Sequence, residues 1–201
     1  MSAVDRAVEA IHDGRLAVVP TDTVYGLATN PHSEAPVRRL YRAKGRANLQ
    51  PTALIVADLD LLFECVPELR GRAAGAIAQA LLPGAFTLVL PNPAGRFRWL
   101  AGSNPETIGV RVPVLAGPGG EVLARVGVMV ATSANLPGAS DPRTLDEVPA
   151  ELRNAAAALV DGGELPGTPS TVIDFTGPEP VVLREGAAPA ADALRAVGSV
   201  L

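Results

Sequence analysis

The sequence has very few of the residues that build redox, metal or base-stacking sites. Its 201 residues include one cysteine, which excludes a disulfide within the chain, and two histidines, His12 and His32, with no second ligand at metal-site spacing. We therefore expect no structural zinc site. Cys65 has no basic neighbour to lower its pKa, which favours a packed thiol over a nucleophile. Aromatic residues make up only 3% of the chain, so few side chains can stack on single-stranded bases.

Long apolar runs and the common nucleotide-binding fingerprints are absent too. No uninterrupted apolar stretch reaches the roughly 18 residues that a membrane span needs, and the N-terminus lacks the residue order of a signal peptide. We therefore expect a soluble, cytoplasmic protein. Neither a Gly-x-x-x-x-Gly-Lys-[Ser/Thr] loop nor a Gly-x-Gly-x-x-Gly segment follows a strand, so any nucleotide is held in another way. The net charge of −4 argues against a protein that coats nucleic acid over its whole surface.

What the sequence does contain is an alternation of strand and helix patterns. It predicts a single α/β domain over residues 1–201, with a twisted mixed sheet flanked by helices and no linker that separates two domains. Strands are expected at 16–19, 53–57, 86–90, 107–112, 126–131, 170–174 and 181–184. Helices are expected at 2–13, 33–43, 69–82, 122–125, 151–159 and 190–197.

The most distinctive stretch is residues 20–27, Pro-Thr-Asp-Thr-Val-Tyr-Gly-Leu. It follows the apolar run 16–19, which has the composition of a buried strand and which Pro20 ends by removing an amide. Loops that leave buried strands in α/β domains are common ligand sites, and this one offers two threonine hydroxyls, a carboxylate and a phenol. A capped turn, in which Thr21 and Asp22 bond local amides, accounts for the segment equally well. Both interpretations stay open.

Polar side chains also lie at the ends of several other expected strands. They are Thr107 and Arg111, Thr132, Ser133 and Asn135, Ser170 and Thr171, and Arg184. In one sheet these groups predict a polar concave surface lined by amides and cations.

Arg111 is the most informative of them, because it occupies an interior position of an apolar strand. Period-two alternation places it on the same face as Thr107 and Gly109. An unpaired guanidinium is costly to bury, so either a protein carboxylate or an anionic ligand accompanies it. The candidate carboxylates are Asp22, Asp161 and Asp174.

Five basic residues and no acid occur between Arg38 and Arg46. Lys44 and Arg46 lie two residues apart around Gly45, a spacing that suits a phosphate clamp built from an ammonium and a guanidinium. A solvated basic helix end, stabilised by the helix macrodipole, is the alternative.

Taken together, these segments resemble the YrdC-like threonylcarbamoyl-AMP synthases, a family that acts in threonylcarbamoyladenosine modification of tRNA. The matching segments appear in the family's order and span residues 20–186. They are residues 20–27, Lys-Gly-Arg at 44–46, residues 82–87, Thr-Ile-Gly-Val-Arg-Val-Pro at 107–113, Ala-Thr-Ser-Ala-Asn at 131–135, Pro-Ser-Thr-Val-Ile-Asp at 169–174 and Leu-Arg-Glu-Gly at 183–186. The resemblance implies a YrdC-like open sheet with a large, positively lined cavity.

The resemblance also implies substrates and site residues. The substrates are L-threonine, bicarbonate and ATP, and the products are threonylcarbamoyl-AMP and pyrophosphate. Lys44 and Arg46 are the implied catalytic residues and bind the triphosphate. The implied threonine-binding residues are Thr23, Tyr25, Arg111 and Ser170, and the remaining nucleotide-binding residues are Thr107, Ser133, Asn135 and Arg184. Mg²⁺ is expected on the ATP phosphates, and the sequence identifies no dedicated protein ligand for it.

Three departures from the family pattern affect loop details. Ala85 follows Pro83-Gly84 where the family often has proline, Leu136-Pro137-Gly138 replaces a Ser-Gly pair, and the strand 53–57 lacks a histidine that some members carry. Because the chain ends at Leu201, we expect it to lack the C-terminal domain of longer members.

Two other functions are compatible with the same features. The first is a non-catalytic paralogue that binds double-stranded or transfer RNA through the basic concavity; it has no need of Thr23 or Ser170. The second, a carbamoyl-transfer domain of hydrogenase maturation, normally lies within a much longer chain. A tRNA-modifying transferase complex is the expected partner, and direct contact with RNA stays open.

Overall fold

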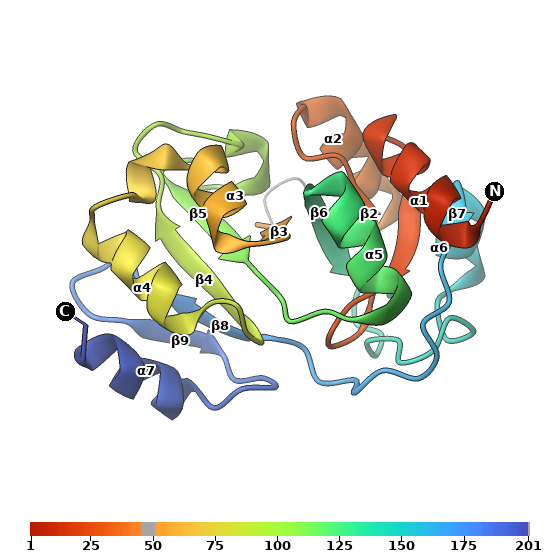
Figure 1. The fold of residues 1–201 in the computed structure, drawn as a ribbon. Helices are drawn as coiled ribbons and strands as arrows, with labels where there is room; N and C mark the ends of the chain where they lie inside the picture. Colours follow the sequence, from red (N-terminus) through yellow and green to blue (C-terminus); the bar gives the residue numbers. More distant parts are fainter. Residues whose placement is uncertain (46–50, 201) are drawn as a thin grey trace.

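The computed structural model describes residues 1–45 and 51–200, and its nine strands form one mixed sheet (Figure 1). The strand order is β7-β1-β2-β6-β3-β5-β4-β8-β9. The strands are β1 (Ala17–Pro20), β2 (Tyr25–Thr29), β3 (Leu54–Val56), β4 (Phe86–Pro91), β5 (Thr107–Arg111), β6 (Val128–Ser133), β7 (Ala158–Leu159), β8 (Thr171–Asp174) and β9 (Val181–Arg184). The α-helices are α1 (Ala3–His12), α2 (Glu34–Ala43), α3 (Leu59–Cys65), α4 (Ala73–Leu81), α5 (Gly117–Val126), α6 (Ala150–Ala155) and α7 (Ala190–Gly198). The predicted fold class, a single α/β domain with a mixed open sheet, is confirmed.

The two faces of the sheet are covered unequally. On one face, residues such as Leu54, Leu88 and Val110 pack in a large core with α2, α3, α4 and α7. On the other face, α1 and α5 cover the side of the sheet that carries β1 and β2, where Val19 and Ala28 are buried. Neither helix extends over β4, β5 and β8, so the second face is open there, and the candidate site lies in this opening.

Segment 160–170 crosses the molecule from one side of the sheet to the other. It leaves β7, an edge strand, and runs along the bottom of the view in Figure 1 to β8, which neighbours the opposite edge. Residues from distant parts of the chain are thereby brought to the open face.

Several elements differ from the sequence-based expectation, and α3 (Leu59–Cys65) forms where no helix was expected. The 20–27 stretch is not wholly a loop, because Tyr25–Thr29 forms β2, which pairs antiparallel with β1 and β6. The alanine-rich segment 151–159 is helical only to Ala155, and Ala158–Leu159 adds to the edge of β1. The amides of Ala157 and Val160 donate to the carbonyls of Leu16 and Val18, so tertiary pairing outweighs helix propensity here.

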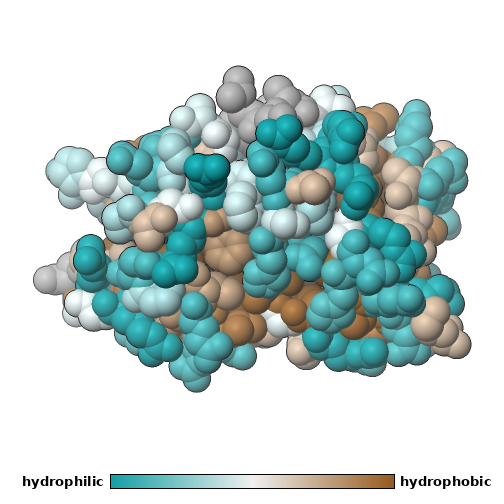
Figure 2. Space-filling model, turned by 90° about the horizontal axis from the view of Figure 1, so that it is seen from above, coloured by the Kyte–Doolittle hydropathy of each residue, from teal (hydrophilic) through white to brown (hydrophobic). Residues whose placement is uncertain are grey.

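Hydrophilic residues dominate the face seen in Figure 2, and hydrophobic residues lie mostly in recesses between them. Within residues 1–45 and 51–200, no helix is long and apolar enough to span a membrane.

The close approach of α5 to β1 gives a test of the fold. A Cβ on Gly119, in the first turn of α5, would lie 2.1 Å from the carbonyl oxygen of Pro20, so Gly119→Ala forces the helix away from the sheet. We expect a loss of about 1–3 kcal/mol in the free energy of unfolding, measured by urea titration. Gly198→Ala is the matched control, because a Cβ there meets no atom within 4 Å. Equal stability of the two variants would contradict this packing.

Candidate functional site

A cavity of about 420 Å³ opens on the uncovered face of the sheet. Its floor is made by alternate residues of neighbouring strands, such as Gly109 and Arg111 of β5 and Val89 of β4. Ile55 of β3 and the preceding Ala53 also line the cavity. Hydroxyl groups are numerous on the wall, from Thr23, Thr52, Thr87, Thr107, Thr132, Ser133 and Ser170. Arg111 shares this face with Thr107 and Gly109, as the alternation of side chains along a strand predicts.

The turn between β1 and β2 is organised by Thr21. Its hydroxyl donates to the carbonyl of Val24 at 2.7 Å and accepts from the amides of Thr23 and Val24, both at 3.2 Å. Thr21 therefore caps the turn, as the simpler interpretation of this stretch expects. Asp22 does not bond local amides, and its side chain extends to Arg111 instead. Thr23 and Val24 face the cavity, so this turn also forms part of its wall.

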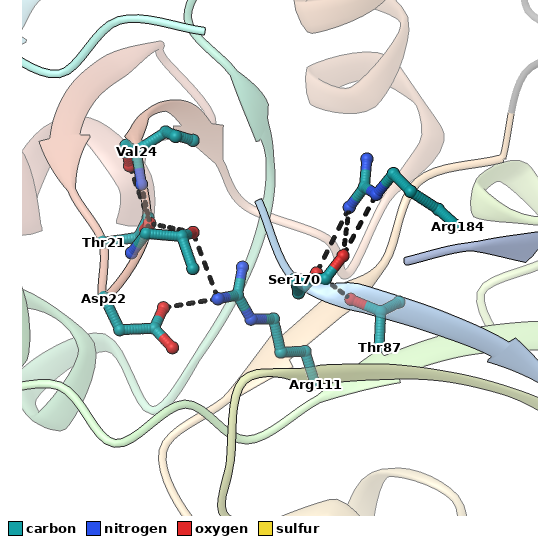
Figure 3. Close-up of polar contacts among 8 residues, drawn as sticks. Thr21, Asp22, Val24, Thr87, Arg111, Ser170 and Arg184 are labelled. Carbon is teal, nitrogen blue, oxygen red and sulfur yellow. Dashed lines mark hydrogen bonds and ion pairs between the residues drawn. The ribbon is translucent and has the colours of Figure 1, made fainter. Parts of the chain in front are cut away.

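The buried Arg111 guanidinium is paired within the protein. Its Nη2 donates to Oδ1 of Asp22 at 2.5 Å and contacts the Thr23 hydroxyl at 3.3 Å (Figure 3). The arginine side chain is 9% exposed and the aspartate side chain 12%, so both charges are largely withdrawn from water. Of the two alternatives left by the sequence, the structure shows the protein carboxylate. Because Arg111 also lines the cavity, this pairing holds its guanidinium at the wall.

A second guanidinium lies on the other side of Arg111 in Figure 3. Arg184 donates from Nε and Nη2 to the carbonyl oxygen of Ser170, at 3.0 and 2.8 Å, and the Ser170 hydroxyl lies 2.8 Å from that of Thr87. Burial lowers the pKa of Arg184 and the positive charge of Arg111 lowers it further, while Asp141 acts in the opposite sense. Two cations therefore line one cavity, an arrangement suited to anionic ligands.

Lys44 lies at the C-terminus of α2 and is only 4% exposed. Its ammonium donates to both the backbone oxygen and the side-chain Oδ1 of Asn135. The same Oδ1 accepts from the Ser133 hydroxyl at 2.7 Å. Ser133 lines the cavity, and Lys44 and Asn135 form the layer behind it. Arg46, the other member of the expected phosphate clamp, falls outside the described residues.

Tyr25 does not occupy the expected position at the threonine pocket. It is fully buried, is not part of the cavity wall, and its phenol oxygen lies 2.8 Å from both the Gly162 amide and the Gly163 carbonyl. Burial raises the pKa of this phenol. Tyr25 therefore anchors segment 160–170, and any contribution to a ligand pocket is made through that segment. Val24, directly before β2, lines the cavity. Because successive side chains of an extended chain point to opposite faces, Tyr25 points away from it.

Residues without a role in the sequence-based site also line the cavity. Thr87 and Val89 alternate along β4, a pattern that the sequence contains, and Thr52 precedes β3. Asp141 has no sequence signal of its own, because it lies in an irregular segment whose path only the fold defines. Cys65 lies outside the wall, and burial raises the pKa of its thiol, which agrees with a packing role.

Comparison with known proteins places these features in a family. The Sua5/YciO/YrdC family model, described as "Telomere recombination", matches residues 9–186. The threonylcarbamoyl-AMP synthase of Pyrococcus abyssi is 34% identical over 196 residues, which cover 94% of this chain and 56% of that protein. A putative threonylcarbamoyl-AMP synthase of Mycobacterium tuberculosis H37Rv is 34% identical over 184 residues, 90% of this chain and 82% of that protein. The chain thus spans just over half the length of the archaeal relative.

Solved structures give the same result. P. abyssi Sua5 complexed with L-threonine superposes with a TM-score of 0.84 at 32% identity, covering 98% of this chain and 58% of that chain. Escherichia coli YciO superposes with a TM-score of 0.80 at 28% identity, covering 93% of this chain and 90% of that one.

Tyr25→Phe tests the anchoring of segment 160–170. The substitution leaves the ring in place but removes the acceptor of the Gly162 amide, so we expect a loss of about 1–3 kcal/mol in unfolding free energy. Chemical denaturation measures it, and hydrogen exchange at Gly162 and Gly163 should quicken more than exchange elsewhere. An unchanged denaturation midpoint would show that the phenol does not hold this segment.

Proposed function

The chain belongs to the Sua5/YciO/YrdC family, and on that premise we propose that it is an L-threonylcarbamoyladenylate synthase. Its substrates are L-threonine, bicarbonate and ATP, and its products are threonylcarbamoyl-AMP and pyrophosphate. The product serves threonylcarbamoyladenosine modification of tRNA, which places the enzyme in the cytoplasm and gives it a tRNA-modifying transferase complex as partner.

The reaction requires the protein to position the substrates and to stabilise the charge that develops on them. The threonine amine and bicarbonate give a carbamate and water. A carbamate oxygen then attacks the α-phosphorus of ATP, and pyrophosphate leaves with the electrons of the broken P–O bond. No covalent protein nucleophile is required. A wall rich in hydroxyls and guanidiniums fits this reaction.

The observation that carries the proposal is the set of groups gathered at Arg111. Thr23 contacts its guanidinium, and Ser170, held by Arg184 and Thr87, lies on its other side (Figure 3). We assign Arg111 to the threonine carboxylate, and Thr23 and Ser170 to the same substrate. RNA binding, the other candidate function, does not require the hydroxyl groups of Thr23 and Ser170 beside a buried arginine.

In this proposal the nucleotide takes the part of the cavity lined by Thr52, Thr107 and Ser133. Thr107 and Ser133 lie on its wall, with Lys44 and Asn135 directly behind Ser133, and Arg184 lines the cavity as well. We assign the triphosphate to Lys44 and Arg46 as the catalytic cations, and the rest of the nucleotide to Thr107, Ser133, Asn135 and Arg184.

Mg²⁺ enters with ATP in this proposal. Among residues 1–45 and 51–200, no group of three His, Cys, Asp or Glu side chains is placed to hold a metal ion. We propose that phosphate oxygens and water hold the ion, whose contribution is to neutralise phosphate charge.

Pyrophosphate release from ATP and Mg²⁺ by the purified protein tests the function. We expect release only when threonine and bicarbonate are both present, because the attacking carbamate needs both. Omission of either substrate is the internal control. If the folded protein releases no pyrophosphate and instead binds RNA in a salt-dependent way, the paralogue replaces the synthase.

Substitutions of Arg111 and Lys44 test the division of the cavity. Arg111→Ala should abolish threonine-dependent turnover, and Arg111→Lys should retain part of it by keeping the charge. Lys44→Ala should raise the KM for ATP more than the KM for threonine. Thermal unfolding of each variant controls for folding. The opposite order of KM effects at Lys44, or full turnover in Arg111→Ala, would contradict the assignment.

A further inference from the structure

Asp141 is a carboxylate on the wall of a cavity that otherwise suits anions. It is half-buried and lies in the irregular segment that follows β6. The other acids near the wall are engaged: Asp22 pairs with Arg111, and Asp174 accepts from the amide and hydroxyl of Thr176. Within the described ranges, Asp141 has neither a hydrogen-bond nor an ion-pair partner. Its charge is therefore available to a ligand.

The fold places Asp141 at the same part of the cavity as Thr23. The carbonyl of Pro142 accepts the amide of Tyr25 at 2.9 Å, which fixes residue 141 beside the turn that carries Thr23. Thr23 in turn contacts the Arg111 guanidinium at 3.3 Å. The Asp141 carboxylate also acts on Arg184 through space, although the two side chains form no ion pair within 4.0 Å. Asp141, Arg111 and Arg184 all line the same cavity, so a ligand inside it can reach charges of both signs.

Carboxylate and guanidinium groups that face a common gap recognise a zwitterion. A lone carboxylate at this position would repel a phosphate or an acid without an amine, and only a ligand that also carries a positive or hydrogen-donating nitrogen compensates it. An α-amino acid has this character, since its amino group and carboxylate are attached to the same carbon. Arg111 alone does not distinguish an amino acid from another small carboxylic acid.

We propose that Asp141 binds the α-amino group of the substrate amino acid while Arg111 holds its carboxylate. This inference rests on the proposed function and deepens it. Asp141 thereby makes the site specific for a free amino acid and orients the nitrogen that reacts with bicarbonate.

Equilibrium titration with L-threonine and with 3-hydroxybutanoate, which is threonine without its amino group, tests the proposal. The isosteric variant Asp141→Asn should bind threonine at least about tenfold more weakly than wild type, the loss expected when a charge-assisted hydrogen bond is removed. It should bind 3-hydroxybutanoate as well as wild type or better, because the repelling charge is gone. A structural defect would weaken the binding of both ligands to a similar extent.

Asp146→Asn is the matched control. It makes the same charge change in the same segment at a fully exposed side chain, and it should leave both affinities unchanged. Equal threonine affinity in Asp141→Asn and wild type would overturn the proposal. A similar loss of affinity for threonine and for 3-hydroxybutanoate would overturn it as well. Weaker ATP–Mg²⁺ binding with threonine affinity intact would overturn it in favour of a metal-binding role. If the wild-type protein binds no threonine, the proposed function itself fails, which separates the two results.

Discussion

The ion pair between Arg111 and Asp22 joins two parts of the sheet that the sequence keeps far apart. Arg111 belongs to β5, whereas Asp22 lies in the turn between β1 and β2, with β6 and β3 between them in the sheet. Burying two charges costs solvation free energy that their attraction only partly offsets, so such a pair is weak evidence for stability. The ion pair matters here because it fixes the position of the Arg111 side chain. It holds a guanidinium on the wall of a cavity where a flexible side chain would otherwise sample many directions.

The rest of the site is assembled around this fixed charge by the segment that crosses the molecule. Segment 160–170 is held by the phenol of Tyr25 near its start and by a bond from the Gly167 amide to the Thr23 carbonyl farther along. It ends at Ser170, whose carbonyl oxygen accepts a hydrogen bond from Arg184 of β9. A single stretch of chain therefore connects the β1–β2 turn with the opposite edge of the sheet, and it links Thr23 and Ser170, which both line the cavity.

Sequence reasoning predicted the parts of this structure that follow from local pattern. Alternation placed Arg111 with Thr107 and Gly109 on one face, and Asp22 was among its candidate partners. The β-strand at Tyr25–Thr29 was missed because its short mixed composition gives no clear period, and only pairing with β1 and β6 makes it a strand. Tyr25 was assigned to the pocket through the family resemblance, whereas in the structure its phenol bonds to segment 160–170 and does not line the cavity. No sequence pattern predicted that Asp141 lies at the cavity, because its position depends on the hydrogen bond from the Tyr25 amide to the Pro142 carbonyl.

The side chain of Asn135 joins the buried Lys44 to the cavity wall. Its ammonium is held by two oxygens of Asn135, and neither oxygen carries a charge. Asn135 also accepts from Ser133 on the wall, and its amide nitrogen donates to Ala139 at 2.6 Å. The hydrogen bonds of Asn135 therefore join Lys44, Ser133 and the Ala139 carbonyl, two residues before Asp141, in one polar network.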